Sequence, residues 1–143
     1  MANDISILAP ISLIEAHDGH IERIIMVSDQ STELVFDKLT VYHAVAVDRY
    51  ELWLYRATLT LGNASAFSIR GLLAPDEYLD DGVIVNGEME LDWMDLLQPQ
   101  PATKATITFA PGPSLEILCS SAHLSLHEPK RFLEEWIGPL VSQ

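Results

Sequence analysis

Two histidines near the start of the chain have a spacing that could hold a metal ion. His17 and His20 flank Asp18-Gly19, a dipeptide typical of tight hairpin turns because it accepts positive φ angles. A two-residue turn there would make the two imidazoles cross-strand neighbours, with Cβ atoms about 5 Å apart. Imidazole nitrogen is a common zinc ligand, and Glu15 or Glu22 lies one step away to add a carboxylate. The pattern therefore predicts a metal site at His17 and His20; polar residues at an exposed turn are the alternative.

A second candidate is the acidic segment between residues 71 and 103, which contains no lysine or arginine. Its uncompensated charge would create a negative field that reaches about 10 Å at 0.1 M salt and steers a cationic protein toward the surface. An aromatic side chain inside it could anchor the contact. A solvated face that keeps the protein soluble is the alternative. The predicted partner-binding residues are Asp76, Glu77, Asp80, Asp81, Glu88, Glu90, Asp92, Trp93 and Asp95.

No residue pattern predicts a familiar catalytic chemistry. The chain has no nucleophile elbow, phosphate-binding loop, H-E-x-x-H pair or EF-hand spacing. Cys119 alternates with inward-facing residues, and His43 lies in an apolar alternation, so both are interpreted as core residues. Paired carboxylates beside tryptophans would suit a glycosidase-like cleft, but among 21 acidic residues such pairs arise by chance. We predict no catalytic residue and no cofactor.

Composition limits the compartment and the partners. A chain of 143 residues that is 48% hydrophobic and 20% charged is typical of one globular domain, residues 1–143. The net charge of −13 and the scattered basic residues argue against binding nucleic acid or anionic lipid. A single cysteine forms no internal disulfide, and the N-terminus lacks the pattern of a secretory signal. A cytoplasmic protein without a membrane span is expected.

Turn signals divide most of the chain into pairs of strands. Each signal places glycine, proline, asparagine or aspartate between two segments in which apolar and polar residues alternate. Residues 32–36 and 39–47 alternate as further strands, and the second is apolar on both faces, which predicts a central position. The predicted turns are Asp18-Gly19, Gly62-Asn63-Ala64, Asn86-Gly87 and Pro111-Gly112-Pro113.

The alternation also predicts which residues face one another. Around the Pro-Gly-Pro loop it sets Phe109 opposite Leu115, and around the Asn-Gly turn it sets Ile84 opposite Met89. The turn at residues 62–64 would pair the two strands on either side of it.

Only the C-terminal segment predicts a helix. Pro129 suits a first helical position, and Gly138-Pro139 would end the helix. An apolar stripe at helical spacing would cover one end of the sheets. The stripe comprises Phe132, Leu133, Trp136 and Ile137.

These elements predict an all-β, mainly antiparallel protein. About ten strands joined by short turns form a meander, which must either close or fold into two sheets to protect its edges. The predicted fold is a meander β-sandwich or a flattened barrel with one short C-terminal helix.

The segment from Glu15-Ala16-His17-Asp18-Gly19 through the strands to Leu59 resembles the opening of small bacterial all-β domains, which include uncharacterised proteins and some toxin-immunity proteins. This resemblance implies tight stoichiometric binding of a toxin, with no cofactor and no turnover. The sequence as a whole favours a non-catalytic bacterial binding protein that engages a basic protein. The alternatives are a small metal-binding or metal-assisted enzyme using the histidine pair, and a structural subunit of a larger assembly of unknown oligomeric state.

Overall fold

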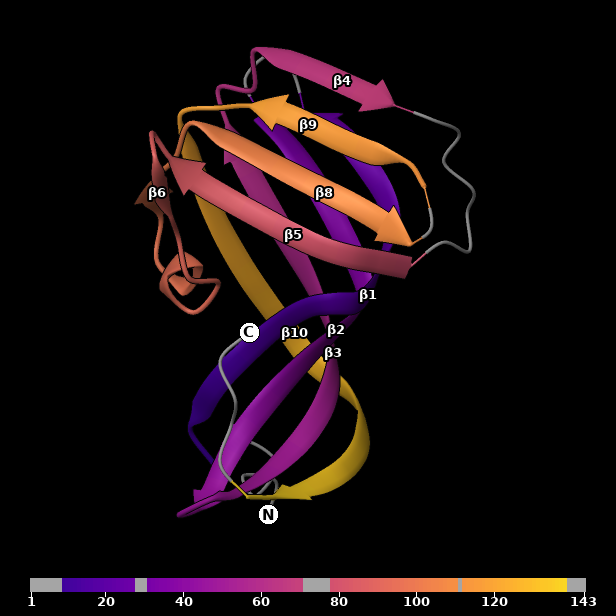
Figure 1. Cartoon of the computed structure of the whole chain (residues 1–143), viewed down its shortest axis with the longest axis vertical. Coiled ribbons are helices and arrows are strands. Elements are labelled where there is room, and N and C mark those ends of the chain that lie inside the picture. The colour runs from indigo at the N-terminus through magenta and orange to yellow at the C-terminus, as the bar shows by residue number, and fades with distance from the viewer. Residues whose placement is uncertain (1–8, 28–30, 71–77, 111, 139–143) are drawn as a thin grey trace.

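The computed structural model describes residues 9–27, 31–70, 78–110 and 112–138, which form ten strands and one 3₁₀ turn (Figure 1). The first half contains β1 (Ile11–Val27), β2 (Ser31–Ala46), β3 (Arg49–Gly62), β4 (Ala66–Arg70) and β5 (Tyr78–Asn86). The second half contains β6 (Met89–Glu90), η2 (Asp95–Leu97), β7 (Gln100–Pro101), β8 (Lys104–Ala110), β9 (Ser114–Leu118) and β10 (Ser121–Ile137).

The strands form two antiparallel sheets of five strands each, in the orders β1-β2-β3-β10-β7 and β4-β9-β8-β5-β6. The predicted all-β antiparallel class is confirmed, and β2 lies between two other strands, as its two apolar faces predict. The sheets do not close, so the flattened barrel is wrong. The order is also not a simple meander, because β10 returns to pair with β3.

The two sheets face each other over only part of the molecule, which we call the two-sheet body (Figure 1). Alternate residues of β3, including Leu59 and Leu61, are fully buried there against side chains of the second sheet such as Ile107 and Ile117. Each such side chain contributes about 1.5–3 kcal/mol when it leaves water. This shared apolar core joins the two sheets.

The long strands of the first sheet continue past the second sheet as an extension, formed by residues 11–15, 39–46, 49–55 and 127–137 (Figure 1). Inside it His43 is 2% exposed and hydrogen-bonded at both ring nitrogens. Its Nδ1 donates to the carbonyl of Ala9 at 2.5 Å, and its Nε2 accepts from the Tyr55 hydroxyl at 2.7 Å. The interpretation of His43 as a satisfied core residue is confirmed.

The predicted C-terminal helix is wrong. Residues 121–137 form one long strand, β10, which pairs with β3 to its end, where Ile137 faces Arg49. Aromatic and β-branched residues suit a strand as well as a helix, and pairing with β3 decides between the two. Phe132, Leu133 and Trp136 are consequently exposed and do not cover the end of the sheets.

The predicted hairpin turn at Asp18-Gly19 is also wrong, because β1 runs through it without reversing. The strand instead has irregular pairing with β2 between Glu15 and His20, and Asp18 adopts a positive φ of 65°. A side chain at Gly19 would meet the Ala16 carbonyl at 2.9 Å, so the bulge requires glycine there. A β-bulge uses the same residue types as a tight turn, which explains the misreading.

The other turn predictions have mixed outcomes. The hairpins β8–β9 and β5–β6 are confirmed, but each register is displaced by two residues: Ile107 faces Leu115, and Val85 faces Glu90. A two-residue displacement preserves the alternation, so β8 and β9 keep their predicted faces. In the β5–β6 hairpin Met89 is 59% exposed and does not share the buried side with Ile84 as predicted. The turn at residues 62–64 does not make a hairpin, since β3 and β4 belong to different sheets.

Candidate functional site

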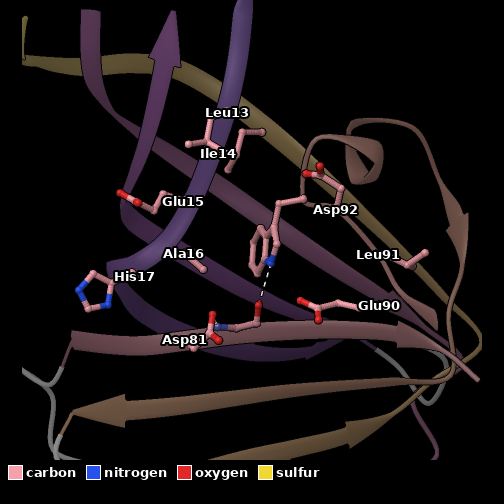
Figure 2. A pocket seen from close by; sticks show the side chains of 11 residues that line it. Leu13, Ile14, Glu15, Ala16, His17, Asp81, Glu90, Leu91 and Asp92 are labelled. Carbon is pink, nitrogen blue, oxygen red and sulfur yellow. Dashed lines mark hydrogen bonds between the residues drawn. The ribbon is translucent and has the colours of Figure 1, made fainter. Parts of the chain in front are cut away.

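A pocket of about 390 Å³ opens where the extension meets the two-sheet body (Figure 2). Residues 13–17 of β1 form one wall, and residues 81, 82 and 90–93 of β5, β6 and the loop that follows form the other. Its volume lies within the range of small-ligand sites in proteins. The two walls come from segments more than sixty residues apart in the sequence.

The pocket is built on the open edge of β5. The carbonyls of alternate residues point toward this edge, and each accepts a hydrogen bond either from β1 or from the segment that follows β6. His17 Nδ1 donates to Asp80 O at 2.9 Å, Trp93 Nε1 to Gly82 O at 2.9 Å, and the Leu91 amide to Ile84 O at 2.8 Å. These contacts cover an edge that would otherwise attract foreign strands.

Gly82 allows the Trp93 indole to lie directly on β5. A Cβ at this position would meet Trp93 Cζ2 at 2.9 Å and Ile107 Cδ1 at 3.3 Å. Trp93 also makes an edge-to-face contact with Phe36, at 6.0 Å between ring centroids. The pocket wall is therefore continuous with the core and is held in one arrangement.

Four carboxylates line the pocket, from Glu15, Asp81, Glu90 and Asp92 (Figure 2). Asp81 accepts a hydrogen bond from the Gly82 amide at 2.8 Å. Asp92 accepts one from the Met94 amide at 3.0 Å. Within the described residues none of the four forms an ion pair with lysine or arginine. The pocket therefore carries uncompensated negative charge.

Tyr42 orients one of these carboxylates from the neighbouring strand. Its hydroxyl donates to Glu15 Oε1 at 3.3 Å. Burial, and then the negative charge of Glu15, raise the pKa of Tyr42 to about 12, so the hydroxyl keeps its proton at neutral pH. Tyr42 therefore remains a hydrogen-bond donor that orients the Glu15 carboxylate.

His17 adds a titratable group to the same wall. Its Nδ1 carries the proton that binds Asp80 O, because a carbonyl only accepts. This hydrogen bond, followed by the charges of Asp18, Glu15 and Asp80, raises the pKa of His17, while partial burial acts in the opposite direction. The Nε2 atom lies 3.6 Å from Asp18 Oδ2.

The acidic segment is only partly gathered in the pocket. Asp81, Glu90 and Asp92 line it, whereas Asp80, Glu88 and Asp95 are exposed residues that do not line it. Asp76 and Glu77 lie outside the described residues. None of the described acids of this segment is paired with a lysine or arginine that the structure places.

Trp93 does not fit the role of an exposed anchor. Only 7% of it is accessible, its indole N–H is bonded to Gly82, and it forms part of the pocket wall. The sequence offers no signal for this, because tryptophan suits a buried position and an interface equally well.

The geometric premise of the metal site at His17 and His20 is wrong, because no hairpin makes them cross-strand neighbours. His17 binds the Asp80 carbonyl, while His20 Nδ1 lies 2.6 Å from Asp37 Oδ1. Glu15 lines the pocket, and Glu22 pairs with Arg56 at 2.8 Å. Among the residues the structure describes, no group of three or more histidine, cysteine or carboxylate side chains is arranged to hold a metal ion.

Sequence reasoning missed how β1 contributes to this site. Glu15 stands out in the sequence only as a neighbour of His17, and the partnership with Asp81, Glu90 and Asp92 depends on the crossing of β1 and β5. The glycine after Asp81 was a usable signal, since a glycine inside an alternating strand often marks a close approach.

Fold and site together define an all-β protein of two antiparallel sheets with an acidic pocket at one sheet edge. Comparison with protein-family models, with curated proteins and with solved structures finds no match. Within the described part of the chain, no helix has the length and apolar content needed to cross a bilayer.

Proposed function

We propose that the protein acts by binding a basic protein, and that a lysine or arginine side chain of this partner enters the pocket between β1 and β5. The observation that supports this most directly is the set of four pocket carboxylates without a basic counterpart among the described residues. Like charges that share a pocket repel one another, and a cation placed among them relieves that repulsion. A lysine or arginine side chain supplies that cation.

The lining suits the amphipathic shape of such a side chain. Lysine and arginine carry an apolar stem and a charged head. Leu13, Leu91 and the Trp93 ring offer apolar surface for the stem, and the carboxylates offer acceptors for the head. Arginine is favoured, because its planar fork can bond two carboxylate oxygens at once.

The charge outside the pocket supports the approach of the partner. Asp80, Glu88 and Asp95 extend the negative surface, and the whole chain carries a formal charge of −13. Such a field raises association rates with cationic proteins and weakens as salt is added. The proposal therefore predicts strong salt dependence.

The resemblance of residues 15–59 to immunity-type proteins gives a specific form of this proposal. A bacterial, cytoplasmic protein of this kind would occlude a basic toxin by tight stoichiometric binding, without turnover. The acidic pocket would then hold one basic side chain of the toxin at the centre of the contact.

A charge-matched pair of triple variants tests the role of the pocket. The pocket variant carries Asp81→Asn, Glu90→Gln and Asp92→Asn, which keep the hydrogen-bond acceptors that Gly82 and Met94 use. The control carries Glu33→Gln, Asp48→Asn and Glu128→Gln, which remove the same charge outside the pocket. The probe is a short peptide of alternating arginine and glycine, with binding measured by calorimetry.

We expect the pocket variant to bind the peptide at least about tenfold more weakly than the control at low salt. Amide NMR shifts on adding the peptide should centre on residues 13–17 and 81–93. Equal losses in the two variants would show that only the overall charge acts, and the pocket would then have no special role.

A further inference from the structure

The lower half of β10 has an open edge. On one side β10 pairs with β3 along its whole length, whereas on the other side β7 pairs only with Ser121 and Ala122. Among the described residues, none forms a strand beside the outer edge of residues 127–137, which lies at the margin of the extension (Figure 1). A strand edge of this kind presents unpaired backbone donors and acceptors to any chain that can pair with it.

Apolar side chains are exposed along the same stretch. Phe132 is 45% exposed, Leu133 38% and Trp136 42%. Phe132 also makes an edge-to-face contact with Trp53 of β3, which fixes its position at 5.5 Å between ring centroids. Exposed aromatic residues beside an open strand edge are typical of a protein contact surface.

The charges on this edge are self-complementary. The residue types along this edge run base, apolar, apolar, acid, in Arg131, Phe132, Leu133 and Glu134. Lys130 precedes this group in the sequence and Glu135 follows it. An antiparallel pair of identical strands with its two-fold axis between residues 132 and 133 sets Arg131 opposite Glu134 of the other copy. The same register brings Phe132 next to Leu133 of the other copy; Leu133 has no partner on β3, because the register shifts between Phe132 and Glu134.

The faces also match. Arg131 pairs with Leu54 of β3 and Glu134 pairs with Leu52, because the register shifts between Phe132 and Glu134, where Leu133 is the extra residue. Leu54 and Leu52 lie on the same face of β3. Residues that meet across a strand pair must share a face, so Arg131 and Glu134 of the second copy satisfy this condition. A parallel arrangement would instead set like charges against each other. Glu135 already binds Arg49 of its own copy at 3.3 Å, so the argument depends on Arg131 and Glu134.

We infer that the outer edge of β10 is a homodimer interface, in which residues 130–135 of two copies pair antiparallel about a two-fold axis. The interface joins the two extensions into one continuous sheet and covers Phe132 and Leu133. It lies on the opposite edge of the sheet from β1, because the order is β1-β2-β3-β10. Both pockets therefore stay open in the dimer, and the inference is independent of the proposed function.

Exchanging the charges of Arg131 and Glu134 tests this arrangement, because each of these residues faces the other one on the second copy. Arg131→Glu sets glutamate against Glu134, and Glu134→Arg sets arginine against Arg131, so each variant should be a monomer by light scattering and sedimentation. The double variant Arg131→Glu with Glu134→Arg should dimerise again. An equimolar mixture of the two single variants should form a heterodimer, because their charges complement each other.

The controls separate a lost contact from a lost fold. Both residues are exposed, so the single variants should keep the wild-type circular dichroism spectrum. Arg23→Glu, an exposed charge reversal on β1, should leave the dimer intact. A wild-type protein that stays monomeric up to about 100 µM overturns the inference, since a specific interface would be occupied there. Single variants that remain dimers overturn it as well, because the contact must then lie elsewhere.

Discussion

The two-sheet body and the extension contain the same long strands, but the extension adds buried side-chain hydrogen bonds to its apolar interior. In the body, alternate residues of β3 such as Ala57, Leu59 and Leu61 are fully buried between two sheets. In the extension, where the second sheet is absent, the interior includes the hydrogen-bonded pair His43 and Tyr55. Apolar side chains such as Leu39 and Val41 are fully buried in the extension too, so its interior combines apolar burial with specific hydrogen bonds. The acidic pocket lies where the two regions meet, and the proposed dimer interface lies on the outer edge of β10 in the extension.

The largest expected difference comes from the same substitution made in both regions. Phe36 is fully buried in the body, and Phe132 is 45% exposed in the extension. Phe36→Ala should lower the free energy of unfolding by about 3–5 kcal/mol, since it removes core contacts and leaves a cavity. Phe132→Ala should cost about 1 kcal/mol or less. Urea unfolding of both variants measures this, and equal losses would contradict the division into two regions.

The junction between the regions should be sensitive to added volume. Gly82→Ala would push a methyl group against Trp93 and the Ile107 side chain, so we expect a loss of about 1–3 kcal/mol from overpacking. In a background where Trp53 and Trp136 are phenylalanine, the emission of Trp93 should shift to longer wavelength as the indole leaves its site. An unchanged spectrum with wild-type stability would show that the close contact is not maintained in solution.

In the extension, the hydrogen bond between Tyr55 and His43 should carry a measurable share of stability. Tyr55→Phe removes the donor to a buried imidazole nitrogen, and an unsatisfied buried acceptor costs about 1–3 kcal/mol. Tyr50→Phe on the same strand is the matched control, because no hydrogen bond of its hydroxyl is present among the described residues; it should be nearly neutral. Equal effects of the two changes in thermal unfolding would refute a specific role of this pair.

The smallest expected effect is a pH dependence at His17. The hydrogen bond to Asp80 O and the nearby carboxylates raise its pKa above the ordinary value of 6.5 in the folded protein. The stabilisation is therefore fully present below pH 6.5 and is lost as the pH rises through the raised pKa. Wild type should exceed His17→Gln in stability by more at about pH 5.5 than at about pH 8. The effect is small because the side chain is largely exposed, and an NMR titration that gives a pKa below 6.5 would contradict it.

Local sequence patterns identified most strands, because alternation of apolar and polar residues survives wherever one face of a strand is buried. The β5–β6 and β8–β9 hairpins were found for this reason, with the side chains of β8 and β9 on the correct faces. The exact registers were not found, because a shift of two residues preserves the alternation.

The sequence predicted only part of the candidate site. The carboxylates of residues 81, 90 and 92 stand in one acidic segment, but Glu15 joins them only through the crossing of β1 over β5. The predicted metal pair depended on a turn at Asp18-Gly19 that is a bulge, and bulges and turns use the same residues.

By itself, the sequence determined the all-β class, the net charge of −13 and the concentration of acids in one segment, because composition and period-two alternation are local properties. Only the tertiary structure decided that residues 129–137 form a strand, that β3 and β4 belong to different sheets, and that a pocket forms beside β5. The physical reason is that strand pairing and side-chain contact join residues far apart in the chain. The free energy of these long-range contacts outweighs the local preference of a segment for helix or for strand.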